Sequence, residues 1–327
     1  MKDIKVIYLP HPIDAIERQN SFLSEKICEK FDLRIFDRNT SAEPQFDGIE
    51  VIVDLGGNIT AELVHIASRA GIKYIQVQTN GLDHVEVEEI LDAGITLAHC
   101  PGYLSSVSLA EGAMMFILAL GHGYGFATDD FYQGKAFSHQ GLEVAGRDLG
   151  IVGFGASGQQ LARRAKAFGM RVHGIDIREI EKEILEEIGP DSMGYTSDLD
   201  KILSTCDFIS LHLHLNKDTH HIIDSRRINL MKPTTFIINV ARGGLINEDA
   251  LYKALLGHRI AGAGLDAFAK EPPDFTHPVY KLPNVLVQPH TVANTDGTMQ
   301  KRAAFCIDNL VRYAEGKKLI GLISNRI

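Results

Sequence analysis

Short apolar runs alternate with stretches of helical periodicity from one end of the chain to the other. Runs rich in Val, Ile and Leu are typical of buried strands, whereas apolar residues spaced three or four apart indicate a helix with one buried face. Regular alternation of the two predicts βα units and therefore parallel sheets.

The predicted strands fall into two series that are separated by a long helical stretch. The first series comprises residues 5–10, 33–37, 50–55, 74–78 and 96–100. The second series comprises residues 149–154, 171–176, 208–214, 235–240, 261–268 and 285–290. We therefore predict an α/β fold with two separate doubly wound parallel sheets, one built from each series.

Two predicted helices bear on the domain boundaries. A long apolar helix is expected over about 108–121, between the two series. The last helix, over about 295–314, places apolar residues on one face, namely Met299, Ala303, Cys306, Leu310 and Tyr313. Because this helix follows the second series, we expect it to return to the first domain. The first domain is then discontinuous, with residues 1–104 and 295–327, and the second domain comprises residues 105–294.

Composition and charge narrow the class of protein. The 327 residues are 45% hydrophobic and 23% charged, a globular composition in a chain too long for one ordinary core. The net charge of −9, without a basic cluster, argues against nucleic acid and against an anionic membrane surface as partners. The N-terminus lacks the apolar core of a signal peptide, no apolar run is long enough to span a membrane, and the four cysteines lie far apart. This pattern predicts a cytoplasmic protein with free thiols.

A glycine-rich turn follows the first strand of the second series. Gly153, Gly155 and Gly158 form the pattern Gly-x-Gly-x-x-Gly between an apolar strand and a helix. Such glycines permit a tight turn, let the backbone approach a pyrophosphate and let the helix pack on the strand, and the helix N-terminus offers free N–H groups to the phosphates. The alternative is a glycine turn that serves packing alone.

The residue at the end of the next strand indicates which dinucleotide binds. Asp176 follows the glycines by roughly twenty residues, where a carboxylate accepts hydrogen bonds from the adenosine ribose. A 2′-phosphate would meet this carboxylate, although Arg178 offsets part of the repulsion. We therefore predict NAD as the cofactor and regard NADP as less favoured.

Polar residues also lie near the carboxyl ends of later strands. Arg242 directly follows one predicted strand and precedes two glycines, which relieve crowding there. Asp266 lies in the next strand, Glu271 follows it, and His290 ends the last one. Because ligands of an open α/β sheet bind beyond the carboxyl ends of the strands, we expect these side chains to converge on the nicotinamide.

These residue types suit hydride transfer to a 2-oxo acid. The planar fork of Arg242 matches a carboxylate, His290 can supply a proton near neutral pH, and a neighbouring Glu271 favours the charged imidazole. Taken singly, an arginine at a strand end is usually a surface ion pair, and a histidine there is often a hydrogen-bonded loop residue. Together on a dinucleotide-binding fold they indicate a dehydrogenase.

Four stretches resemble the D-isomer-specific 2-hydroxyacid dehydrogenases, which include phosphoglycerate dehydrogenase, glyoxylate/hydroxypyruvate reductase and D-lactate dehydrogenase. They are LGIVGFGASG, INVARGGLINEDAL, AGLDAFAKEPP and VQPH, and the resemblance extends over nearly the whole chain. It implies two Rossmann-like domains with a cleft between them, a catalytic Arg242, a relay of Glu271 and His290, and Asp266 near the nicotinamide. It also implies a homodimer formed through the cofactor domains.

The resemblance includes two N-terminal loops, LGGN and QTNGLDHV, which are similar to the family's substrate-side loops. Backbone N–H groups at Gly56 and Gly57 would hold the substrate carboxylate together with Arg242, and Asn80 and Gly81 would face the cleft. An ordinary turn is the alternative for the two glycines.

The resemblance implies further residues at the cofactor site, namely Ala156, Ser157, Ile177, His212, Val240 and Ala241. Some positions depart from the family pattern. Ala156 and Ser157 replace a frequent Arg-Ile and so remove one phosphate contact, His214 replaces a usual proline, and Gln288 replaces a usual threonine. The tryptophan that often follows the glycine of QGK is absent as well. These changes leave the chemistry intact and the precise substrate open.

The segment LHLHLNKDTHH also suggests a metal site. His212 and His214 are expected on one strand face, with His220 and His221 nearby. The resembling family places this segment beside the cofactor and uses no metal, so we predict no metal and a hydrogen-bonded or cofactor-facing role.

The sequence thus favours an NAD-dependent oxidoreductase that transfers a hydride between the nicotinamide and C2 of a small D-2-hydroxy acid or 2-oxo acid. One alternative is a formate- or phosphite-type dehydrogenase of the same fold. Another is an NAD-sensing scaffold without catalysis, which the presence of Arg242, Glu271 and His290 makes the weaker interpretation.

Overall fold

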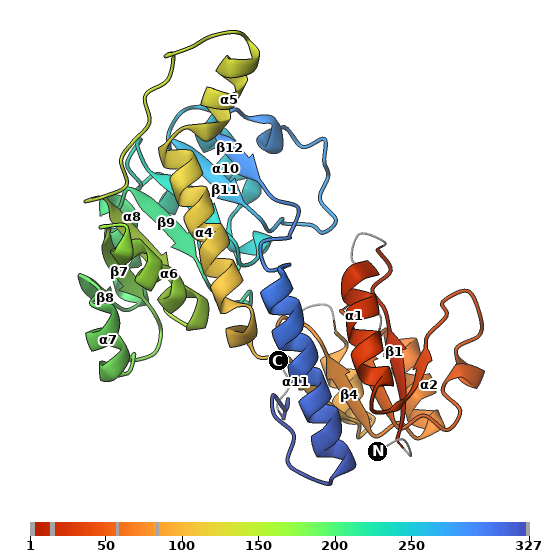
Figure 1. Ribbon diagram of the computed structural model, residues 1–327. Coiled ribbons are helices and arrows are strands. Elements are labelled where there is room, and N and C mark those ends of the chain that lie inside the picture. Colours follow the sequence, from red (N-terminus) through yellow and green to blue (C-terminus); the bar gives the residue numbers. More distant parts are fainter. Residues whose placement is uncertain (1–3, 14–16, 57–58, 83–84, 325–327) are drawn as a thin grey trace. The chain divides into compact units, whose positions relative to one another are not determined.

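The computed structural model describes residues 4–13, 17–56, 59–82 and 85–324, and the chain divides into two compact units (Figure 1). Unit 1 contains Met1–Leu104 and Asp296–Ile327, and unit 2 contains Ser105–Thr295. The predicted boundary at which the chain returns to the first domain, between residues 294 and 295, lies one residue earlier than the boundary in the structure.

Unit 1 is a doubly wound parallel sheet of five strands in the order β2-β1-β3-β4-β5. Its strands are β1 (Lys5–Leu9), β2 (Asp32–Ile35), β3 (Val51–Asp54), β4 (Tyr74–Val77) and β5 (Thr96–His99). Its helices are α1 (Glu17–Cys28), α2 (Ala61–Ala70), α3 (Val87–Asp92) and α11 (Asp296–Ala314), with short 3-10 turns η2 (Glu43–Gln45) and η3 (Gly102–Leu104). The strand order reverses between β1 and β3, which is the position where such sheets bind ligands.

The last helix belongs to unit 1 because its apolar face, with Ala303, Cys306 and Leu310, is buried in the core of that unit and a buried polar bond adds to this packing. In Figure 1, α11 lies alongside α1, against which it packs. The Asn309 carboxamide donates to Gln76 Oε1 on β4 at 2.8 Å and to the Ile320 carbonyl at 2.8 Å, and both Asn309 and Gln76 are fully buried. A bridge between Leu322 and Ala98 then attaches the following segment to β5. The first folding unit is therefore discontinuous in sequence.

Unit 2 is a parallel sheet of seven strands in the order β12-β11-β10-β9-β6-β7-β8. Its strands are β6 (Asp148–Val152), β7 (Arg171–Ile175), β8 (Ser192–Gly194), β9 (Phe208–Leu211), β10 (Phe236–Asn239), β11 (Gly262–Leu265) and β12 (Val285–Val287). Its helices are α4 (Ser106–Gly121), α5 (Tyr124–Tyr132), α6 (Ala156–Ala167), α7 (Lys182–Ile188), α8 (Leu199–Thr205), α9 (Ser225–Ile228) and α10 (Glu248–Leu256), with 3-10 turns η4 (Thr196–Asp198), η5 (Gly243–Leu245) and η6 (Pro278–Lys281). The prediction of two doubly wound parallel sheets is confirmed.

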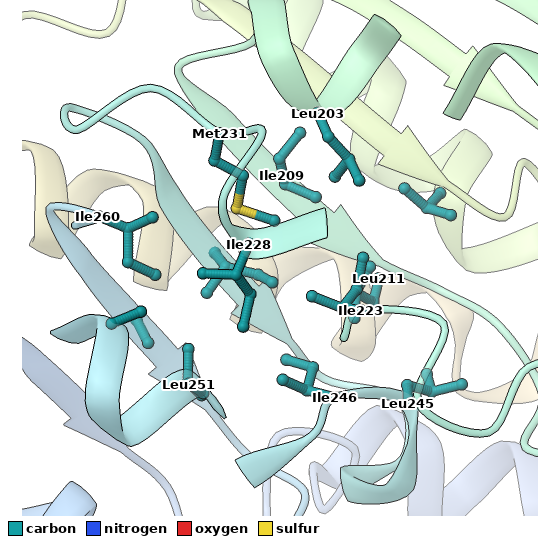
Figure 2. Packing of buried hydrophobic residues seen from close by; sticks show 14 of the residues in the cluster. Leu203, Ile209, Leu211, Ile223, Ile228, Met231, Leu245, Ile246, Leu251 and Ile260 are labelled. Atoms are coloured by element: carbon teal, nitrogen blue, oxygen red, sulfur yellow. The ribbon is translucent and has the colours of Figure 1, made fainter. Parts of the chain in front are cut away.

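Apolar layers cover both faces of the unit 2 sheet. On one face α4 packs so closely that a Cβ on Gly264 of β11 would lie 2.7 Å from the ring of Phe116. On the other face, side chains of α8, α9 and α10 pack on β9 and on the segments that follow the strands (Figure 2). Leu245 and Ile246 enter this second layer directly after the Arg242 turn, and their burial fixes where that turn lies.

Several predicted boundaries are wrong in detail. Strand β9 ends at Leu211, so His212 and His214 lie beyond it and do not share a strand face. Strand β11 ends at Leu265, so Asp266 is the first residue after the strand rather than part of it. The short edge strand β8 was missed because three residues of mixed polarity give no periodic signal.

Among the residues that the structure describes, no single helix is both long and apolar enough to cross a membrane. Helices α4 and α5 together reach that length and composition, but they bend by 57° at the break between them.

Candidate active site

The glycine-rich turn joins β6 to α6 at the point where the strand order of unit 2 reverses. Gly153 has φ +96°, and a Cβ there would lie 2.4 Å from the carbonyl oxygen of His212. A Cβ on Gly158 would lie 2.2 Å from the carbonyl oxygen of Gly153, so α6 approaches the turn at backbone contact distance. Gly155 is not crowded in this way. The atom nearest to a Cβ added there would be a guanidinium nitrogen of Arg178, at 3.9 Å. The turn therefore has open space beside the N-terminus of α6, which suits a pyrophosphate.

Asp176 follows β7 and is almost fully buried. It accepts hydrogen bonds from the Phe154 amide at 2.9 Å and from the amide and Nε of Arg178 at 3.0 and 3.2 Å. Burial raises the pKa of Asp176, but the bonds and charge of Arg178 and the Phe154 amide outweigh burial and hold the pKa below its usual value. The carboxylate is thus ionised and ties the glycine turn to the end of β7. Next to it, the apolar side chain of Ile177 is 81% exposed, as expected for a residue that a planar ligand would cover.

His212 lies against the glycine-rich turn. Its Nδ1 pairs with Ser157 Oγ at 3.0 Å and its Nε2 with Ser210 Oγ at 2.9 Å. Burial lowers the pKa of His212 to about 4, so the ring is neutral near neutral pH. Within the described ranges, no group of three or more His, Cys, Asp or Glu side chains is arranged to hold a metal ion.

The turn that carries Arg242 is fixed by its backbone and by Asn239. Val240 is buried, and the Asn239 carboxamide accepts from the Ala241 amide at 3.1 Å and donates to the Arg242 carbonyl at 2.8 Å. A Cβ on Gly243 would lie 1.8 Å from the backbone carbon of Phe268. Glycine is therefore needed here because the Arg242 turn touches the backbone of the segment that carries Glu271. Asn239 was not predicted from the sequence, although a polar residue at the end of a buried strand is a recognisable turn signal.

Glu271 and His290 form a hydrogen-bonded pair, and both side chains are about two-fifths exposed. Glu271 Oε2 lies 2.5 Å from His290 Nδ1, and Glu271 Oε1 accepts from the Phe268 amide at 3.2 Å. The pairing with Glu271 raises the pKa of His290 above its ordinary value, although burial and the charge of Arg242 oppose this. Burial alone raises the pKa of Glu271, but His290, the Phe268 amide and Arg242 lower it in net. The imidazolium–carboxylate form is therefore favoured, and Nε2 of His290 remains for a ligand.

Asp266 holds the loop that carries His290. Its buried carboxylate accepts from the amides of Thr291 at 2.8 Å and Val292 at 3.2 Å. Burial is the largest influence and raises the pKa of Asp266 to about 6, although these amides and the charge of His290 act in the opposite direction. The structure thus brings Arg242, Asp266, Glu271 and His290 together at one edge of the unit 2 sheet.

Of the predicted substrate-side residues, Gly56, Asn80 and Gly81 are described, and they follow the carboxyl ends of β3 and β4 in unit 1. Gly56 follows β3 with φ +63°, and Gly57 lies outside the described residues. The carbonyl of Asn80 pairs with Nδ1 of His99 at 2.9 Å, and the carbonyl of Gly81 accepts from the Thr79 hydroxyl at 3.0 Å. These bonds give the loop after β4 a defined backbone.

Comparisons with known proteins agree with this fold. Residues 114–292 match the family described as D-isomer specific 2-hydroxyacid dehydrogenase, NAD binding domain. D-3-phosphoglycerate dehydrogenase of Methanocaldococcus jannaschii is 35% identical over 83% of this chain, and the match spans only 51% of that longer protein. Glyoxylate reductase of Thermococcus onnurineus is 33% identical over 85% of this chain and 83% of its own length. The crystal structure of D-lactate dehydrogenase from Aquifex aeolicus, complexed with NAD and lactic acid, superposes with a TM-score of 0.79 at 28% identity, over 95% of this chain and 96% of that chain.

The chain belongs to the D-isomer-specific 2-hydroxyacid dehydrogenase family. It is an NAD-binding oxidoreductase of the 2-hydroxyacid dehydrogenase class, as the sequence predicted.

Proposed function

We propose that this protein interconverts a small 2-oxo acid, such as glyoxylate, and the corresponding 2-hydroxy acid, which has the D configuration where its C2 is a stereocentre, with NAD as the preferred dinucleotide. The observation that carries the proposal is the Glu271–His290 pair with Arg242 nearby. This arrangement places a proton donor, His290, close to a cation that can bind a carboxylate, Arg242. The relative named glyoxylate reductase supports a small substrate.

The residues divide the reaction as follows. A nicotinamide dinucleotide held at the glycine-rich turn and Asp176 would supply or accept the hydride at C2 of the substrate. In the direction of reduction, the Arg242 guanidinium binds the substrate carboxylate, and Nε2 of protonated His290 donates its proton to the carbonyl oxygen as that oxygen gains charge. Glu271 stabilises the imidazolium before transfer and keeps Nε2 directed at the substrate. One 2-oxo acid, one NADH and one proton give one 2-hydroxy acid and one NAD, and oxidation reverses each step.

Support for NAD over NADP comes from Asp176, whose ionised carboxylate occupies the place that a 2′-phosphate would approach. Support for substrate contacts from unit 1 comes from Gly56, Asn80 and Gly81, which lie at the carboxyl ends of its strands. A cytoplasmic location stays a prediction from the sequence.

We also propose that the protein is a homodimer formed through unit 2. Helix α4 borders an apolar groove of about 700 Å³, lined among others by Met114, Met115, Leu118 and Phe168. Phe131 and Tyr132 of the adjoining α5 are 74% and 82% exposed, which is costly unless a partner covers them. A second copy is the favoured occupant because the resemblance to the family implies a homodimer, and because both apolar surfaces lie on the adjoining helices α4 and α5. Light scattering should give a dimer mass, and Phe131→Asp with Tyr132→Asp should shift the protein towards monomer.

The experiment that tests the activity is NADH oxidation with glyoxylate, hydroxypyruvate, pyruvate and bulkier 2-oxo acids, together with NAD reduction by formate and by phosphite. Turnover of a 2-oxo acid that disappears in His290→Asn supports the proposal. Turnover of formate or phosphite alone would replace it with the alternative dehydrogenase. Dinucleotide binding without turnover of any of these would favour the scaffold.

A further inference from the structure

His290 has a backbone conformation that residues with a side chain rarely adopt. Its φ is +55°, in the left-handed region. Such a conformation persists only where the surrounding structure holds it, and it is often found at functional sites. The direction of the His290 ring, and with it the bond to Glu271, therefore depends on whatever fixes this turn.

Gln288 forms hydrogen bonds around the turn through both its backbone and its side chain. Its amide donates to the Leu265 carbonyl at the end of β11 at 2.9 Å, and its carbonyl accepts from the His290 amide at 3.0 Å. Its side-chain Oε1 accepts from the hydroxyl of Thr291 at 2.9 Å. The last bond connects Gln288, which precedes the turn at His290, to Thr291, which follows it.

The orientation of the Gln288 carboxamide and the position of Thr291 are each fixed by a further contact. Nε2 of Gln288 lies 3.9 Å from Met115 Sδ on α4, a weak acceptor, which leaves Oε1 facing the Thr291 hydroxyl. The Thr291 amide donates to the carboxylate of Asp266, so its backbone is attached to the sheet. Both partners of the hydroxyl–carboxamide bond are thus anchored independently.

We propose that Gln288 and Thr291 are positioning residues whose side-chain hydrogen bond holds His290 in its left-handed conformation, with Nδ1 on Glu271. The inference rests on the proposed role of His290 as the proton donor. Without the bond, the turn relaxes towards ordinary backbone angles and the ring spends less time on Glu271. Proton donation then slows, and the imidazolium loses part of its stabilisation.

Four variants isolate the bond. Thr291→Val removes the hydroxyl without changing the shape, and Gln288→Met keeps length and flexibility without an acceptor. The double variant tests whether the two side chains act together, and Thr291→Ser restores the hydroxyl. We expect kcat for reduction to fall about fivefold in each single variant, which corresponds to the loss of one ordinary hydrogen bond. The double variant should lose no more than either single variant, and Thr291→Ser should recover most of the rate.

The pH profile separates positioning from a general structural defect. In both single variants, the alkaline limb of the reduction profile should move to lower pH, with KM and NADH affinity near wild type. Losses that multiply in the double variant, or limbs that superimpose on wild type, would overturn the inference.

A second measurement does not depend on turnover. Titration of ¹³C-labelled histidines by NMR, with His290 assigned by its absence in His290→Asn, should show a lower His290 pKa in Thr291→Val and Gln288→Met and recovery in Thr291→Ser. An unchanged His290 pKa would contradict the inference even in an active enzyme. A wild-type protein that reduces none of the 2-oxo acids would refute the proposed function instead, and the titration would still report on the turn.

Discussion

The position of each functional side chain at this site depends on backbone contacts made by neighbouring residues. Those neighbours are less conspicuous in the sequence than the functional residues themselves. Arg242 follows a buried strand, but its direction depends on Asn239, whose carboxamide accepts from the Ala241 amide and donates to the Arg242 carbonyl. Glycine at 243 is needed because the backbone of Phe268 occupies the space of a Cβ. Arg242 and Gly243 could both be identified from the sequence, but the contacts that fix the arginine and require the glycine are visible only in the structure.

The planar fork of Arg242 predicts that lysine cannot replace it. Lysine keeps the charge but presents one compact ammonium group, so bidentate binding of a carboxylate is lost. We expect kcat/KM to fall at least tenfold in Arg242→Lys, or about 1.4 kcal/mol of transition-state binding. Arg171→Lys, at a surface pair with Asp148, is the matched control and should retain wild-type kinetics. Wild-type kinetics in Arg242→Lys would remove this residue from the site.

Asp176 and Arg178 predict how cofactor preference can be changed. Asp176→Ser removes the charge that repels a 2′-phosphate and frees Arg178 from its pairing. The ratio of kcat/KM for NAD to that for NADP should therefore fall in this variant. A wild type that already prefers NADP would show that Asp176 does not face the ribose.

At the scale of elements, the site is the meeting of three loops that follow β10, β11 and β12. Parallel strands bring their carboxyl ends to one edge, so the rule that ligands bind there was enough to group Arg242, Asp266 and His290. The rule could not reveal Gln288 and Thr291. Their role arises from one side-chain bond across a left-handed turn, and such a turn has no periodic signal. Gln288 stood out in the sequence only as a departure from the family pattern.

The loop after β10 contacts the loop after β11 at Gly243, so a methyl group added at this position should strongly reduce activity. In Gly243→Ala the new Cβ would lie 1.8 Å from the Phe268 backbone carbon, so the Arg242 and Glu271 segments must separate. A displacement of about 1 Å at such a site costs about 100-fold in rate, and we expect kcat/KM to fall by that order. Gly244→Ala is the control, because its Cβ meets Leu215 Cδ2 at 3.0 Å and a side-chain end can move aside. Equal activity of the two variants would contradict the role assigned to the loop contact.

At the scale of the whole molecule, the strand series and the two folding units could be predicted because parallel strands buried on both faces are apolar throughout. The return of the last helix was inferred only from its order in the chain. The apolar face of this helix was visible in the sequence, but its partners were not, because the core cluster that takes up Cys306 and Leu310 and the bond from Asn309 to Gln76 join residues far apart in the chain. The substrate contacts from unit 1 and the homodimer through unit 2 stay proposals. The activity assays test the first and light scattering tests the second.

The most direct test of the central claim is a pair of pH profiles of kcat/KM, in reduction and in oxidation, for wild type and Glu271→Gln. Glu271 raises the pKa of His290, so removing its charge should lower that pKa. Reduction needs protonated His290, and its alkaline limb should therefore move to lower pH. Oxidation needs neutral His290, and its acid limb should move in the same direction. Profiles of the variant that superimpose on wild type in both directions would contradict the coupling of Glu271 to the proton donor.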